Sequence, residues 1–103
     1  MRVIALSTLR NFWELPAHRN AEQPLRAWYF EAMAATWLNP AELKAQFQSA
    51  SILKGSRVVF NIKGNDYRLI TSISYKQQAI FVKFVGTHVE YDKVNAETVD
   101  QSH

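Results

Sequence analysis

Four residues in the second half of the chain have side chains that suit RNA cleavage without a metal ion. In such a reaction the 2′-hydroxyl of the RNA attacks the adjacent phosphate, and the protein supplies a base, a proton donor and positive charge. Arg68 could hold two phosphate oxygens with its planar guanidinium group. His88 could act as base or acid, and Tyr91 could orient the phosphate or exchange a proton. Lys83 could add charge, or act as the base if it is desolvated.

A second group of residues could hold the RNA around such a site. Asn61 could position the arginine or a ribose hydroxyl. Most lysine side chains are simply exposed to solvent, so a lysine alone is weak evidence of RNA contact. We nevertheless identify four basic residues as plausible contacts to the RNA backbone: Lys54, Arg57, Lys63 and Lys76.

Each catalytic candidate also has an ordinary structural explanation. An arginine on a strand is often a surface ion-pair partner, and Tyr91 could close the core with its ring. His88 could be a residue at the rim of a helix cap. Thr87 and Glu90 form the capping-box pattern Thr-x-x-Glu, which helix capping alone explains.

Three β-rich runs in the second half predict an antiparallel meander, because hairpin-length connections separate them. The runs cover residues 57–63, 67–75 and 80–86. Side chains alternate between the two faces of a strand, so Asn61, Arg68 and Lys83 are expected on one face, with Val85 among them. The opposite face should receive the helices, and it carries Val58, Phe60, Ile62, Leu69, Ile73, Val82 and Phe84.

The turns set the expected register of these strands. A two-residue turn at 64–65 places Asn61 opposite Arg68, and direct cross-strand neighbours are about 5 Å apart. A two-residue turn at 77–78 places Ser72 opposite Lys83 and Thr87 opposite Arg68. A helical turn beginning at Thr87 would then bring residues 88 and 91, which are three apart, to the rim of the polar face beside Arg68.

The first half of the chain predicts helices that cover this sheet, which makes the fold α+β. Ser7 is the expected cap of the first helix, and Asn39 and Pro40 are the expected cap and first position of the third. We expect one domain over residues 1–95 and a polar, disordered tail over 96–103. The expected elements are a strand over 2–6 and helices over 7–18, 21–36 and 41–47.

Composition narrows the functional classes. The chain has 103 residues, a net charge of +3 and no cysteine, so disulfides, cysteine zinc sites and thiol nucleophiles are excluded. His18, His88 and His103 show no metal-ligand spacing, and we expect no metal and no cofactor. No apolar run reaches the roughly 18 residues of a membrane helix, and we expect a cytoplasmic protein with an anionic partner.

Two runs of the sequence resemble the HigB-type toxins of the RelE-like mRNA interferase superfamily. They are VVFNIKGNDYRL, residues 58–69, and FVKFVGTHVEYDKV, residues 81–94. The earlier segments AWYFEA and LNPAELKAQF fit the helical half of the same group, so the resemblance covers about residues 1–95. Through these motifs it carries over Arg68, Lys83, His88 and Tyr91, with Asn61 and Asp92 in supporting positions.

The resemblance implies a compact RelE-like fold with two to three N-terminal helices on one face of a mainly antiparallel sheet. It implies the toxin of a type II toxin–antitoxin system, a metal-independent endoribonuclease that cleaves mRNA, often on the translating ribosome, and inhibits translation. The implied partner is a HigA-like helix-turn-helix antitoxin. The toxin itself would contact DNA only indirectly, through this antitoxin. It does not decide between His88 and Lys83 as the base.

Two other functional classes compete with the ribonuclease. A non-catalytic module could bind RNA or an acidic protein through the basic face, and substitution of His88 or Tyr91 would then leave its function unchanged. A DNA-binding regulator is disfavoured, because no predicted helix combines the turn and the basic face that major-groove reading requires.

Overall fold

The computed structural model describes residues 1–101 and consists of one mixed sheet with helices on both sides. The predicted α+β class is confirmed. The helical elements are α1 (Leu6–Trp13), the 3₁₀ helix η1 (Pro16–Ala21), α2 (Glu22–Ala34), α3 (Pro40–Gln46) and α4 (His88–Tyr91). The strands are β1 (Arg2–Ile4), β2 (Ser51–Ile52), β3 (Arg57–Ile62), β4 (Tyr67–Ser74) and β5 (Ala79–Thr87).

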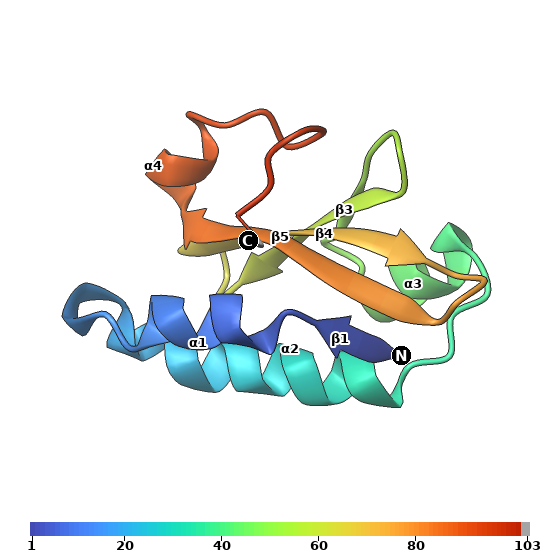
Figure 1. Ribbon diagram of the computed structural model, residues 1–103, viewed down its shortest axis with the longest axis horizontal. Coiled ribbons are helices and arrows are strands. Elements are labelled where there is room, and N and C mark those ends of the chain that lie inside the picture. Colours follow the sequence, from blue (N-terminus) through green and yellow to red (C-terminus); the bar gives the residue numbers. More distant parts are fainter. Residues whose placement is uncertain (102–103) are drawn as a thin grey trace.

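The sheet has the strand order β1-β5-β4-β3-β2 (Figure 1). Strands β3, β4 and β5 form the predicted antiparallel meander. The short edge strand β2 was not predicted from the sequence, and it pairs antiparallel with β3. Strand β1 pairs parallel with β5. Parallel pairing needs a long connection, and helices α1 to α3 and strands β2 to β4 lie between these two strands in the sequence.

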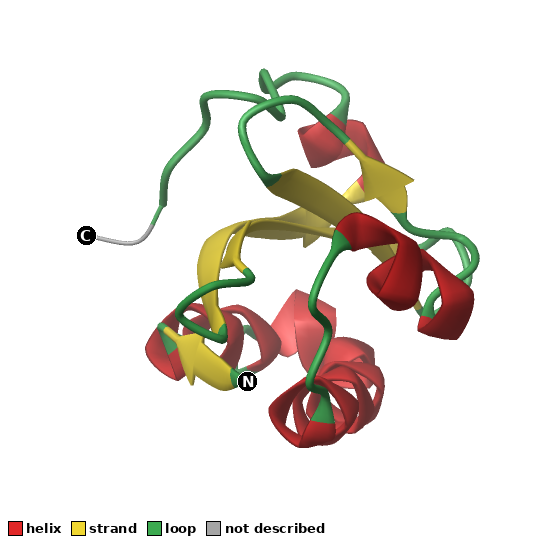
Figure 2. Ribbon diagram, turned by 90° about the vertical axis from the view of Figure 1, so that its right-hand side faces the viewer, coloured by secondary structure: helices red, strands yellow, loops and turns green. Residues whose placement is uncertain are grey.

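Helices α1, α2 and α3 lie on one side of the sheet, and the main core lies between the two layers (Figure 2). The predicted stripe of α2 is buried through Leu25, Trp28 and Ala32. Helix α3 begins as predicted, because the Asn39 side chain accepts a hydrogen bond from the Glu42 backbone N–H at 3.0 Å.

The predictions for α1 were partly wrong. The helix begins one residue before Ser7 and its N-cap is Ala5, so Ser7 lies within the first turn and does not cap it. The helix ends at Trp13 instead of continuing to residue 18. Pro16 explains the break, because it disfavours helical backbone at Leu15, which is extended, and a 3₁₀ helix follows.

The β4–β5 register differs from the prediction along its whole length. The turn between these strands has four residues, so Ser72 pairs with Phe81 rather than with Lys83. A β-bulge then leaves Lys83 as an extra residue between two paired positions, and Arg68 pairs with Gly86 rather than with Thr87.

The bulge exchanges the faces of the two residues that follow it. Phe84 packs with Val59 and Ile70 on the sheet face opposite α1 to α3, which we call the open face. Val85 packs into the main core. The predicted positions of Phe84 and Val85 were therefore wrong, because one extra residue inverts the alternation of side chains.

Residues 94–101, which we call the C-terminal strap, cross the open face after α4 (Figures 1 and 2). Val94, Ala96 and Val99 pack against the cluster of Val59, Ile70 and Phe84. The Gln101 N–H donates to the Lys83 carbonyl at 2.7 Å. The sequence predicted a disordered tail from residue 96, whereas in the structure residues 96–101 lie against the sheet and the side chains of Ala96 and Val99 are partly buried. Residues 102–103 lie outside the described part.

None of the helices in residues 1–101 combines the length and the apolar character that a membrane crossing would require.

Candidate functional site

An arginine and a tyrosine meet at one end of the open face. Arg68 lies near the start of the central strand β4, between Asn61 on β3 and Gly86 on β5. Its guanidinium carbon lies 5.7 Å from the centre of the Tyr91 ring. Its Nη1 atom donates to the Asn65 carbonyl at 3.2 Å. The structure thus confirms that Asn61 lies opposite Arg68, and it brings Arg68 and Tyr91 together as predicted.

Helix α4 holds Tyr91 in this position through a complete capping box. The Thr87 hydroxyl accepts from the Glu90 N–H at 3.2 Å, and the Glu90 carboxylate accepts from the Thr87 N–H at 2.8 Å. The His88 N–H donates to the Asp66 carbonyl at 3.2 Å, which ties the helix to the loop before β4. Together these bonds fix α4 at the ends of β4 and β5.

Gly86 allows Phe84 and Glu90 to lie close to the β5 backbone opposite Arg68. A Cβ atom at residue 86 would lie 2.7 Å from the Phe84 ring and 3.1 Å from the Glu90 carboxylate. The first distance is shorter than Cβ atoms show in real proteins. Any larger residue opposite Arg68 would have to displace the Phe84 ring and shift the Glu90 carboxylate slightly.

His88 lies one helical turn from Tyr91 on α4, as the sequence predicted. Its side chain is half exposed, and its Nδ1 atom lies 3.2 Å from a carboxylate oxygen of Asp92. A carboxylate on one ring nitrogen orients the imidazole and leaves the other nitrogen for substrate. The supporting position expected for Asp92 therefore has a structural counterpart.

Lys83 lies on the same face, but its contacts are of a different kind. Its ammonium group lies 3.3 Å from the Asp100 carboxylate of the strap and 5.9 Å from the centre of the Phe81 ring. The side chain is only 21% exposed. Neither partner is Arg68 or Tyr91. The Lys83 side chain at the bulge therefore interacts with the strap instead of with that pair.

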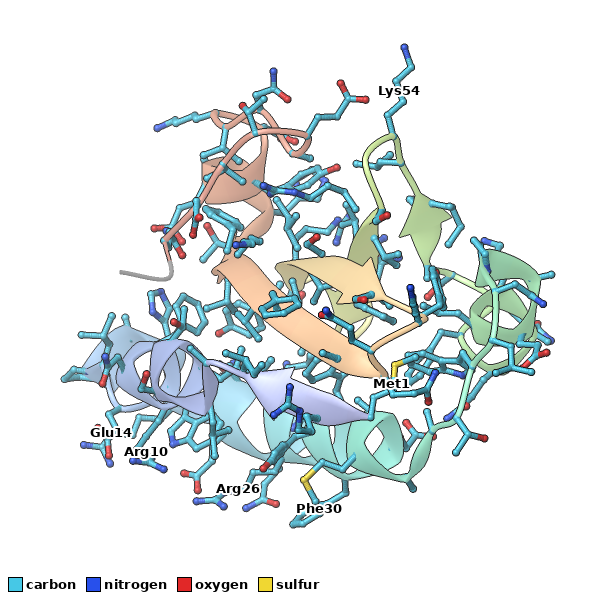
Figure 3. All side chains as sticks on the ribbon, turned by 45° about the vertical axis from the view of Figure 1, so that its right-hand side comes forward. Met1, Arg10, Glu14, Arg26, Phe30 and Lys54 are labelled. Atoms are coloured by element: carbon cyan, nitrogen blue, oxygen red, sulfur yellow. The ribbon has the colours of Figure 1, made fainter. Side chains whose placement is uncertain are left out.

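The four basic residues predicted to contact the RNA backbone do not form one surface. Arg57 donates to the Val99 carbonyl at 2.6 Å, so the strap occupies its guanidinium group. Lys63 is exposed and pairs with Asp66 at 3.0 Å, and this hydrogen bond raises the pKa of the lysine. Lys54 projects from the loop before β3 into solvent (Figure 3).

Lys76 lies in the turn after β4. Arg68 is eight residues earlier, near the other end of that strand, which at about 3.3 Å per residue is on the order of 26 Å away. One phosphate group therefore cannot contact both Lys76 and Arg68. Of the four, Lys63 is nearest in sequence to the Arg68 end of the sheet.

Sequence reasoning missed the strap and its contacts. The apolar residues Val94, Ala96 and Val99 were the available signal, but they lie among polar residues without a regular period. Within residues 1–101, no three histidine or acidic side chains are grouped closely enough to hold a metal ion.

Comparison with known proteins identifies the class. Residues 21–94 match the HigB_toxin family model, described as the RelE-like toxic component of a toxin–antitoxin system. The match covers most of the chain and includes Arg68, Lys83, His88 and Tyr91. The chain therefore belongs to the HigB toxin family, and the family resemblance expected from the sequence is confirmed, as is its RelE-like α+β fold.

Similar proteins carry a more specific name. Over 55 residues the chain is 36% identical to the mRNA interferase toxin HigB of Escherichia coli strain K12. It has the same identity with the mRNA interferase HigB of Escherichia coli O157:H7 and of Shigella flexneri. These matches cover 52% of this chain and 53% of each relative, so the chain spans about half the length of the curated relatives it matches.

Proposed function

We propose that this protein is the toxin of a type II toxin–antitoxin system and a metal-independent endoribonuclease that cleaves mRNA. The observation that carries the proposal is the Arg68 guanidinium over the Tyr91 ring, beside a histidine on the same short helix. A planar cation, an imidazole and a phenol at one rim are the groups that RNA self-cleavage requires. The names of the relatives support the same activity.

In this mechanism His88 takes the proton of the ribose 2′-hydroxyl, while Asp92 orients the imidazole ring. The 2′-oxygen then attacks phosphorus and the bond to the 5′-oxygen breaks, which leaves a 2′,3′-cyclic phosphate. Arg68 neutralises the negative charge on the phosphate oxygens, and Tyr91 donates the proton to the departing 5′-oxygen.

Lys83 has a different role in this proposal. It is ion-paired with Asp100, whereas His88 shares α4 with Tyr91. We therefore assign the base to His88 and a charge-supplying role to Lys83. Asn61, opposite Arg68, positions the guanidinium or a ribose hydroxyl. Lys63 contacts the RNA backbone. Lys54 precedes Arg57, which pairs with Ser72, so Lys54 lies with Lys76 at the end of the sheet away from Arg68; the positions of Lys54, Arg57 and Lys76 therefore favour no contact in the same complex.

The partners follow from the family. A toxin–antitoxin system implies an antitoxin, and we propose that it is a HigA-like helix-turn-helix protein that contacts DNA on behalf of the complex. We further propose that the toxin acts in the cytoplasm on mRNA held by the translating ribosome, where it inhibits translation.

The test is expression of the protein without its antitoxin, followed by mapping of RNA ends. The wild-type protein should arrest growth and produce new mRNA ends, and Arg68→Ala should lose both. Arg2→Ala is the matched control, because Arg2 is exposed on the edge strand β1 away from the site. Intact mRNA in cells that contain folded wild-type toxin and active ribosomes would overturn the proposal and favour a non-catalytic binding module.

A further inference from the structure

A polar cavity of about 370 Å³ lies on the far side of the β5 end from Arg68. Ligand pockets in proteins usually start at roughly 300 Å³, so the cavity is large enough for a small ligand. Helix α1 supplies Ser7, Asn11 and Phe12, α4 supplies Glu90, and the strap supplies Gln101. Nothing in the mechanism above uses these side chains as ligand contacts.

The polar groups around the cavity form a mixed set of hydrogen-bond donors and acceptors. The Gln101 Oε1 atom accepts from the Val85 N–H at 3.2 Å, which leaves the amide NH₂ of that side chain as a donor. One oxygen of Glu90 is used by the capping box, and the second oxygen remains an acceptor. Asn11 is exposed on α1 and carries both kinds of group.

One wall of the cavity is aromatic. The Phe12 ring stacks on the His18 ring with a centroid separation of 4.1 Å and an angle of 11°, and both residues line the cavity. Phe12 is buried, so the partly exposed His18 ring is the member of this pair that a ligand can reach. An aromatic ring beside donors and acceptors is the combination that recognises an unpaired RNA base, which stacks on a ring and bonds through its edge.

The position of the cavity connects it to the candidate site. Val85 lines the cavity, and the next residue, Gly86, is the β5 partner of Arg68. Glu90 likewise precedes Tyr91 on α4. The cavity and the Arg68–Tyr91 pair therefore lie on two sides of the same strand end, and α4 lies against both.

We propose that this cavity binds the base of a nucleotide next to the scissile phosphate, and that Asn11, Glu90 and Gln101 read its edge. The inference rests on the proposed RNA cleavage and adds a base preference to it. A strand of RNA bound across the end of β5 would present its phosphate to Arg68 and an adjacent base to the cavity.

The first experiment maps cut sites for the wild type and Asn11→Ala. Alanine is a better helix former than asparagine, so this exposed change in α1 should not impair folding. The wild type should favour one base at a fixed position beside the cut. Asn11→Ala should reduce that preference by about three- to tenfold, the effect of one lost hydrogen bond. Gln23→Ala, another exposed amide on a helix, should leave the preference unchanged.

A second experiment does not depend on cleavage. The four ribonucleoside monophosphates are titrated separately into the Arg68→Ala variant, and the NMR signals of the Asn11 and Gln101 side-chain amides are followed. One of the bases should move these signals at lower concentration than the other three.

The outcomes separate the two proposals. Identical cut-site preferences for wild type and Asn11→Ala, or amide signals that no nucleotide moves, would overturn the base site while leaving cleavage intact. A wild type that cuts no RNA would instead overturn the proposed function, and the titration would still decide whether the cavity binds a base.

Discussion

Replacement of Tyr91 separates its chemical role from its packing role. The ring lies against Arg68 and is partly buried on the open-face cluster that contains Ile70 and Phe84. Tyr91→Phe removes the hydroxyl and keeps the ring in both contacts. Tyr91→Ala removes the ring as well.

The structure gives different magnitudes for the two variants. A positioned acid or base contributes about 10²–10⁴-fold to rate, so Tyr91→Phe should lower RNA cleavage by at least about 100-fold. Its free energy of unfolding should change by less than about 1 kcal/mol, because the ring packing and the cation–π contact remain. Tyr91→Ala should also destabilise the protein by about 1–3 kcal/mol, less than the roughly 3–5 kcal/mol of a fully buried ring.

The assay measures the rate of appearance of new mRNA ends in a translation reaction with purified toxin, alongside thermal unfolding of each variant. If Tyr91→Phe cleaves within about threefold of the wild type, the hydroxyl takes no part in proton transfer. In that case Tyr91 serves only to pack α4 against Arg68, and another group must protonate the departing oxygen.

Three further changes probe the surroundings of this pair. Asp92→Asn removes the carboxylate 3.2 Å from the His88 Nδ1 atom, and cleavage should fall about three- to tenfold while the unfolding temperature stays constant. Asp100→Asn releases Lys83 from its ion pair, and the affinity for single-stranded RNA, measured by fluorescence anisotropy, should rise by up to about fivefold. Thr87→Ala removes the helix cap, which should destabilise α4 locally by about 0.5–2 kcal/mol and lower cleavage; hydrogen exchange of the α4 amides measures the fraying.

Each of these changes has a clear contrary result. Full activity of Asp92→Asn would mean that His88 needs no orienting partner. Glu97→Gln is the matched control for Asp100→Asn, because it removes an exposed acidic group from the same segment; equal effects of both would indicate a general charge effect. Unchanged cleavage by Thr87→Ala would show that α4 stays in place without its cap.

The sequence predicted the α+β class, the meander and the meeting of Arg68 with Tyr91, because these depend on local patterns. The turn near residue 64 fixes the β3–β4 register, and the capping box from Thr87 fixes where α4 begins. Both signals involve residues close together in the chain, where turn and cap chemistry determine geometry.

The β4–β5 register could not be predicted in the same way. The predicted face of Lys83 is confirmed, because the expected register and the observed one differ by two residues at the turn and both place Lys83 on the open face. The bulge that follows depends on tertiary packing: it turns Phe84 toward Ile70 and Val85 toward the main core. A pattern of alternating residues carries no information about such an inserted position.

The packing of the strap could not be predicted for a related reason. Its polar composition is typical of a frayed end, yet Val99 finds an apolar cluster on the sheet and its carbonyl accepts from Arg57. Arg57 is 42 positions earlier in the sequence, and the cluster residues Val59, Ile70 and Phe84 come from three different strands, so only the assembled sheet supplies these partners.

The pairing of β1 with β5 has a consequence for synthesis of the protein. Val3 lies beside Ile80, so the first strand of the sheet stays without its partner until almost all of the meander has been made. Helix α4 and its tyrosine are translated directly afterwards. A growing chain therefore lacks both the completed sheet and the groups around Arg68 until late in synthesis. The fold and the proposed cleavage activity should then arise together rather than in stages.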